Sequence, residues 1–205
     1  MVDRAFGEFA AARGQTVRLA SFLTQSQFDF SPRAGRWSIG EVVDHLILAE
    51  DLYRGAVRRL VELARAGKRP YLRRSFSDVN VSPLFMPDVM LSMLEMPFSI
   101  VNRFMPEAIR NFATEYPFLP TRNPDVATPR PGRSAAALRD ELVSSLEQTR
   151  SLLMSHADLD FETMISEHPL TGATNVPQIL GFLARHERRH HSQIERVKSD
   201  PRFPW

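Results

Sequence analysis

Hydrophobic and polar residues follow a helical period along four long stretches of the chain. In each stretch, apolar side chains recur every three or four residues, the spacing of a core-facing stripe on an amphipathic helix. The four predicted helices cover residues 3–26, 38–66, 134–156 and 177–198. No stretch has a convincing strand pattern. The chain therefore predicts an all-α fold, a four-helix bundle built as a single domain over residues 1–205.

Local signals mark several ends of these helices. Ser38 is a good N-cap, and Glu41 three residues later completes a capping box. Ser134 is the N-cap candidate of the third predicted helix, and Pro177 suits the first turn of the fourth. These residues predict where three of the four helices begin.

Residues 68–131, between the second and third predicted helices, have a different character. They hold ten of the fifteen prolines and five of the eight methionines. Proline breaks long helices, so we expect a long Pro/Met-rich insertion with only short helices, such as 88–95 and 98–112. Its Met and Phe side chains would line a pocket or partner surface, or would simply pack onto the domain.

Two histidines lie on the apolar stripe of the last predicted helix. His186 and His190 are four residues apart, so their side chains lie on one face, one turn apart. The flanking stripe positions, including Leu183 and Ile194, are apolar. Two imidazoles at this spacing can bind one metal ion. The alternative is a pair of core histidines bonded to other side chains, or an exposed helix end.

Composition narrows the function classes. There is no cysteine, which excludes disulfides and thiolate chemistry of the chain itself and suits a reducing cytoplasm. No apolar run approaches the roughly 18–20 residues that span a membrane, and the start does not resemble a signal peptide. The net charge is +2, from 26 basic and 24 acidic residues. We therefore expect a cytoplasmic protein with neither nucleic acid nor membrane as partner.

Residues 37–46, Trp-Ser-Ile-Gly-Glu-Val-Val-Asp-His-Leu, resemble the first signature of the DinB-like family, which includes bacillithiol- and mycothiol-dependent transferases. The second signature resembles 168–172 and then 178–194. The insertion is longer than the family's usual connection, so nothing is carried over to it. The resemblance implies a four-helix bundle with one histidine of the second helix and two of the fourth on a divalent metal. By position, these ligands are His45, His186 and His190.

Three neutral nitrogen ligands leave coordination positions open, as in catalytic zinc sites. We expect zinc or nickel, with manganese or iron as alternatives. The expected function is a metal-dependent enzyme, a thiol S-transferase or hydrolase, in which the metal activates a thiol or water. Its partners would be a small-molecule substrate and a low-molecular-weight thiol, in a homodimer. No catalytic residue beyond the metal ligands is predicted.

Two other functions compete with this one. The first is a non-enzymatic, stress-related protein, dimeric or binding a small ligand. The second is a metalloprotease, because residues 186–190 satisfy H-E-x-x-H with Glu187 as the base. Against the protease, no third ligand follows at a known spacing and no edge strand precedes the helix.

Several residues near the predicted ligands have candidate roles. Glu41 or Asp44 could orient a ligand imidazole, or could be a cap or a solvated side chain. Gln193 lies one turn past His190 and could face the site. His191 should point away from the metal, because it is turned about 100° from its neighbour.

Overall fold

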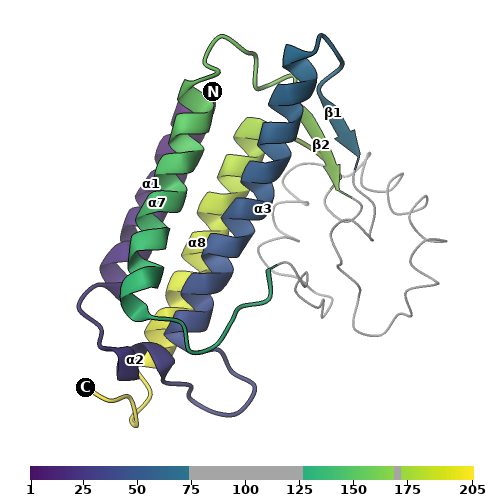
Figure 1. Cartoon of the computed structure of the whole chain (residues 1–205). Coiled ribbons are helices and arrows are strands. Elements are labelled where there is room, and N and C mark those ends of the chain that lie inside the picture. The colour runs from purple at the N-terminus through teal and green to yellow at the C-terminus, as the bar shows by residue number, and fades with distance from the viewer. Residues whose placement is uncertain (74–126, 169–171) are drawn as a thin grey trace, which may run out of the picture.

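The computed structural model describes residues 1–73, 127–168 and 172–205 of the 205-residue chain. Most of these residues are helical, as predicted. The helices are α1 (Val2–Ala20), α2 (Gln25–Asp29), α3 (Ile39–Arg65), α7 (Ala135–Met154) and α8 (Val176–Lys198). Figure 1 shows the four long helices side by side, with α2 and the C-terminal tail together at one end. Helix α1 packs most extensively against α8, and α3 packs against both α7 and α8.

The predicted capping box starts α3. The Ser38 hydroxyl accepts a hydrogen bond from the Glu41 amide at 3.2 Å, and the Glu41 carboxylate accepts one from the Ser38 amide at 2.8 Å. Asn175 and Gln178 form the same reciprocal pair at the start of α8, with Pro177 in its first turn. Side chains thus satisfy amides that a helix start leaves without partners, and they fix where α3 and α8 begin.

The first predicted helix, residues 3–26, is in fact two helices. Helix α1 ends at Ala20, and Phe22 has a positive φ of 63°. The short helix α2 then begins behind a capping box of Thr24 and Gln27. The apolar spacing continues through the break, so it predicts one helix up to residue 26. The capping box of Thr24 and Gln27 is the signal that marks the new start.

The expectation of no strands is corrected by a small three-stranded sheet. Strand β1 (Tyr71–Arg73) pairs in parallel with β2 (Ile165–His168), which pairs antiparallel with β3 (Gly172–Asn175). Each strand has only three or four residues, too few for an alternating pattern to stand out in the sequence. His168, the first residue of the second family signature, lies in β2. The predicted short helices 88–95 and 98–112 lie outside the described residues.

Two apolar clusters fill the core, one toward each end of the long helices. One contains Leu46 of α3 and Ile194 of α8, and the other contains Leu60 of α3 and Leu183 of α8. Where the two clusters meet, each long helix carries polar residues that are buried or half-buried. These residues, the polar layer, are Arg13 and Thr16 on α1, His45, Glu50 and Arg54 on α3, Ser145 and Thr149 on α7, and His186, Glu187 and His190 on α8. The predicted histidines therefore lie in a polar band across the core.

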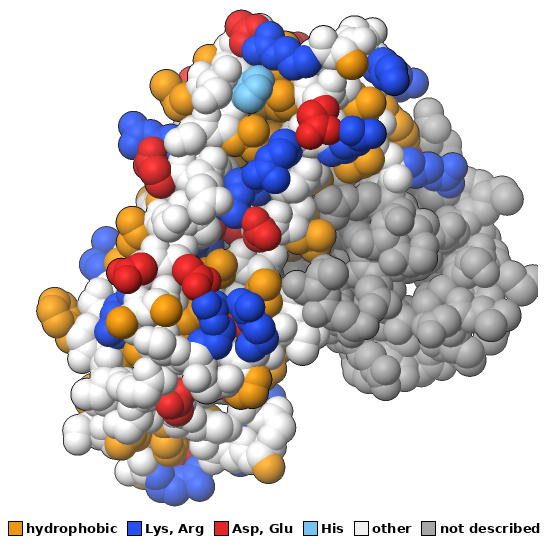
Figure 2. Space-filling model, in the orientation of Figure 1, with side chains coloured by type: hydrophobic (Ala, Val, Ile, Leu, Met, Phe, Trp, Pro, Cys, Tyr) orange, Lys and Arg blue, Asp and Glu red, His pale blue; other side chains and the backbone are white. Residues whose placement is uncertain are grey.

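The surface of the described helices carries both signs of charge. Figure 2 shows basic and acidic side chains interspersed over one face of these helices, not gathered into a patch of one sign. Among the helices that the structure describes, none combines the length and the apolar character needed to cross a membrane.

Candidate metal centre

The structure brings the three predicted histidines together. His45 comes from the first half of α3, and His186 and His190 come from successive turns of α8. The Nε2 atom of His186 lies 3.1 Å from Nε2 of His45 and 2.9 Å from Nε2 of His190. One nitrogen from each ring can be chosen so that all three lie within 4.8 Å of one another. Within the described part of the chain, these three histidines are the side chains grouped closely enough to hold a metal ion.

The hydrogen bonds behind two of the rings fix which nitrogen carries the proton. His45 Nδ1 lies 2.7 Å from the Ala127 carbonyl, and His190 Nδ1 lies 2.9 Å from Oε1 of Gln193. Both oxygens are acceptors, so each Nδ1 must be the donor, and in a neutral ring Nε2 then keeps its lone pair. The His45 and His190 lone pairs both point at His186 Nε2, which can donate to only one of them.

The surroundings keep these rings neutral. Burial lowers the pKa of His45, which the positive charge of Arg189 lowers further. Burial, followed by the neighbouring imidazoles, puts the pKa of His186 well below its ordinary value. Burial, with the same kind of repulsion from His45, lowers the pKa of His190 to about 3. At neutral pH all three rings are therefore uncharged, the form that binds metal.

The donor set fits a divalent cation. Nitrogens about 2.0–2.1 Å from a tetrahedral zinc ion lie roughly 3.3 Å from one another, close to the two Nε2–Nε2 distances here. Nδ1 of His186 is buried and has no hydrogen-bond partner among the described residues. Converging lone pairs beside a buried unpaired nitrogen make a polar cluster that the described protein groups leave unsatisfied. A cation would satisfy the Nε2 atoms directly.

Aromatic side chains flank the cluster. The Trp37 ring lies 4.9 Å from the His45 ring and stacks on His190 at 6.3 Å between centroids. Phe182, one turn before His186 on α8, lies 5.6 Å from that ring and contacts Tyr53 of α3 at 5.1 Å. These half-buried rings give the histidines an apolar border. Sequence analysis did not select Trp37 as a site residue, although it opens the 37–46 signature.

Glu187 points away from the histidines. Its carboxylate, 1% exposed, pairs with the Arg13 guanidinium at 2.7 Å and accepts a short hydrogen bond from the Thr16 hydroxyl. His191 also faces α1, with Nε2 2.8 Å from the Thr16 hydroxyl oxygen. Sequence reasoning thus placed His191 correctly. It missed the contact between Glu187 and Arg13, and this contact leaves the H-E-x-x-H protease hypothesis without its base. The expectation that no edge strand precedes this helix is wrong, because β3 lies at the edge of the small sheet and ends where α8 begins.

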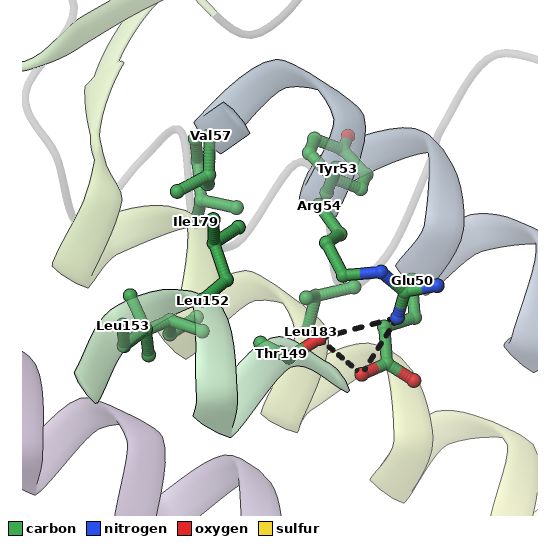
Figure 3. A pocket seen from close by; sticks show the side chains of 10 residues that line it. Glu50, Tyr53, Arg54, Val57, Thr149, Leu152, Leu153, Ile179 and Leu183 are labelled. Atoms are coloured by element: carbon green, nitrogen blue, oxygen red, sulfur yellow. Dashed lines mark hydrogen bonds and ion pairs between the residues drawn. The ribbon is translucent and has the colours of Figure 1, made fainter. Parts of the chain in front are cut away.

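The Glu187 contact belongs to a buried charge network of Arg13, Glu50, Arg54 and Glu187. Arg13 also pairs with Glu50 at 2.9 Å, and Arg54 lies 3.7 Å from the other Glu50 oxygen. Ser145 and Thr149 hydroxyls each donate to Glu50 at 2.6 Å. Figure 3 shows Arg54 and Thr149 directed at the Glu50 carboxylate, beside a small cavity otherwise lined mainly by core side chains. Two positive and two negative charges therefore balance within the network.

The two acidic candidates beside the site have separate tasks. Glu41 caps α3, as the capping box predicted. Asp44 is fully buried and binds Arg130 and Arg133, at 2.8 and 2.7 Å. Burial alone would raise the Asp44 pKa, but the hydrogen bonds from these two arginines lower it below its ordinary value. Neither carboxylate touches a ligand imidazole, so neither Glu41 nor Asp44 orients one of these rings by direct contact.

Fold and site together define a mostly helical protein in which three neutral histidines from two helices could hold a metal ion. A family model, the DinB superfamily, matches residues 8–194, and the chain belongs to this superfamily. The family resemblance of its two signatures is thereby confirmed. No curated protein and no solved structure matches the chain.

Proposed function

We propose that His45, His186 and His190 hold a divalent metal ion and that the protein is a metal-dependent enzyme of the thiol S-transferase or hydrolase kind. The observation that carries the proposal is the convergence of three Nε2 atoms, two of them with lone pairs fixed by the groups behind their rings. Zinc or nickel suits these nitrogen ligands best, with manganese or iron as alternatives.

A divalent ion held by three histidines would lower the pKa of a thiol or water at an open position and so supply a nucleophile at neutral pH. The protein would keep the three imidazoles neutral and would orient their Nε2 atoms toward the ion. Ala127 and Gln193 accept the Nδ1 protons of His45 and His190. Neutral imidazoles would leave the charge of the ion undiminished, which favours an anionic ligand such as a thiolate.

The proposed substrate is a small electrophile, together with a low-molecular-weight thiol. In the transfer, the thiol proton passes to solvent, sulfur forms a bond to carbon, and the leaving group departs with the electrons of its own bond. Trp37 and Phe182 border the histidines and would exclude water from one side of the reacting atoms. In the hydrolase version, water takes the place of the thiol.

We also propose that the chain is one domain whose four long helices form a four-helix bundle. The shared core supports this, because residues of α1, α3, α7 and α8 occur in both apolar clusters or pack against them. The homodimer stays a prediction, which light scattering of the purified protein would test.

Metal content is the first test. Purified protein, saturated in turn with zinc, nickel, manganese or iron and dialysed, should keep close to one equivalent of a divalent ion per chain by elemental analysis. A His190→Ala variant should lose it. His156→Ala is the matched control, because His156 lies on the turn after α7 and Nδ1 of its ring bonds the Leu152 carbonyl, not a residue of the candidate site. Loss of metal by both variants, or by neither, would contradict the proposal.

Activity is the second test. The metal-loaded protein should accelerate the attack of bacillithiol, mycothiol or cysteine on an aryl halide, measured as released halide, or the hydrolysis of a small amide or ester. His190→Ala should abolish either activity, and His156→Ala should not. A protein that binds metal but shows neither activity would instead support the non-enzymatic ligand-binding alternative.

A further inference from the structure

A short piece of chain leading into α7, residues 127–133, is fastened to α3 by one buried carboxylate; we call it the return segment. Asp44 has no exposed surface. Its Oδ2 accepts from the backbone amide of Arg130 at 2.8 Å. Its Oδ1 accepts from Nη2 of Arg130 at 2.8 Å and from Nη1 of Arg133 at 2.7 Å. A charge removed from water is thus paired, and its partners among the described residues belong to the return segment.

The backbone of the return segment suits this attachment. Pro129 and Pro131 restrict φ on either side of Arg130. Gly132 has a φ of +70°, a left-handed conformation that glycine adopts at no steric cost. The turn there lets Arg130 and Arg133, three residues apart, reach the same carboxylate. The segment is therefore held as a shaped unit and not by a single flexible side chain.

The next residue of α3 holds the same segment from the metal side. His45 Nδ1 donates to the carbonyl of the buried Ala127 at 2.7 Å. This bond determines that His45 Nε2, 3.1 Å from His186 Nε2, carries the lone pair. Two consecutive residues of one helix therefore contact one segment.

We infer that Asp44 is a positioning residue of the metal centre: by fastening the return segment it holds the Ala127 carbonyl against His45 and selects the tautomer of His45 that can ligate through Nε2. The inference rests on the proposed function of the three histidines. Groups that hold the far nitrogen of a ligating histidine fix its ring and raise its basicity. Asp44 acts one step further out, through the backbone between Arg130 and Ala127.

Asp44→Asn tests the inference, because it keeps the size of the side chain and removes its charge and one acceptor oxygen. Zn²⁺ affinity, measured by competition with a chromophoric chelator, should fall about 10- to 100-fold, as for groups that orient metal ligands. The matched control is Asp51→Asn, the same change on the same helix. Asp51 pairs with Arg54 at 2.5 Å and has no bond to the return segment, so its affinity should stay at the parent value.

The tautomer of His45 is a second readout, one that a merely structural role of Asp44 would not move. In ¹⁵N spectra of the metal-free protein at pH 8, parent His45 should show a protonated Nδ1 and an unprotonated Nε2. Asp44→Asn should show a mixture of the two tautomers, and Asp51→Asn should match the parent. Because no metal is present, this result stands even if metal analysis refutes the proposed function.

Parent-like Zn²⁺ affinity together with a parent-like tautomer in folded Asp44→Asn would overturn the inference. Should that variant fail to fold, judged by circular dichroism, Arg130→Gln decides. It removes the guanidinium of a side chain that is 59% exposed and keeps the backbone amide that bonds Asp44. A smaller loss of affinity with a partial tautomer change supports the inference, and no change in either overturns it.

Discussion

The polar layer contains two clusters that differ in charge: one pairs opposite charges, and the other gathers neutral imidazoles. In the charge network, two arginines face two glutamates, and hydroxyls of α1 and α7 occupy carboxylate oxygens. In the histidine cluster, the described residues bring converging lone pairs and one unpaired buried nitrogen, with no opposite charge between them. Within the described residues, the first cluster balances its own charges, whereas the second has converging nitrogen lone pairs and only one proton to share between them.

This difference separates a structural polar cluster from a candidate metal site that lies beside it in the core. Buried polar groups are tolerated when each has a partner. His186 and Glu187 are neighbours on α8, yet one faces the histidines of the site and the other faces Arg13. Burial alone therefore does not identify the candidate site, whereas the lone pairs that converge between the three rings do.

The largest effect should come from breaking the charge network. Arg13→Ala leaves Glu50 and Glu187 buried without their shared cation. Removing one partner of a buried ion pair costs about 3–5 kcal/mol, so the free energy of unfolding in urea should fall by that amount. Arg59→Ala, which breaks an exposed pair with Glu62 on α3, is the control and should cost less than about 1 kcal/mol. Similar losses in both variants would mean that the buried network contributes no more to the free energy of unfolding than an exposed ion pair does.

Binding of a divalent ion to the histidine cluster should have the next largest effect. A divalent ion at 100 times its dissociation constant should raise the free energy of unfolding by about 2.7 kcal/mol, because it binds only the folded state. A chelator should reverse the gain in a thermal melt. His186→Ala should respond little to the ion, and His156→Ala should respond like the parent. If His186→Ala gained as much as the parent, the ion would be binding elsewhere.

Coupling energies should sharpen the boundary between the two clusters. Arg13 and Glu187 are in direct contact, so a double-mutant cycle of their alanine variants should give a coupling of about 0.5–3 kcal/mol. Arg13→Ala and His45→Ala touch different clusters and should add within about 0.5 kcal/mol in the metal-free protein. Strong coupling in the second cycle would show that the clusters behave as one network.

The smallest effect concerns pH. Burial lowers the pKa of His190 to about 3, so from pH 7 to pH 6 the folded protein leaves this ring neutral. The unfolded chain takes up a proton near its ordinary pKa of about 6.5, and lowering the pH therefore favours unfolding. The metal-free parent should lose roughly 0.7 kcal/mol more than His190→Gln over this interval. Equal losses in urea titrations would mean that His190 is not kept neutral by the fold.

The sequence predicted the histidine cluster more fully than its surroundings. His186 and His190 stood out because their spacing is local, and His45 was found only through its place in a family signature. The charge network escaped notice because Arg13 meets its glutamates across large separations in sequence, which no local pattern encodes. The Ala127 carbonyl was invisible for a simpler reason, since a backbone acceptor has no sequence signature. The strands were not predicted because each is too short for an alternating pattern to stand out.

Helix α8 carries His186 and Glu187 on faces about 100° apart, so a change in its rotation would misalign both. The buried ion pair with Arg13 thereby fixes the rotation of α8. An ion held by the three histidines would therefore depend on a contact made by a residue that is not one of its ligands.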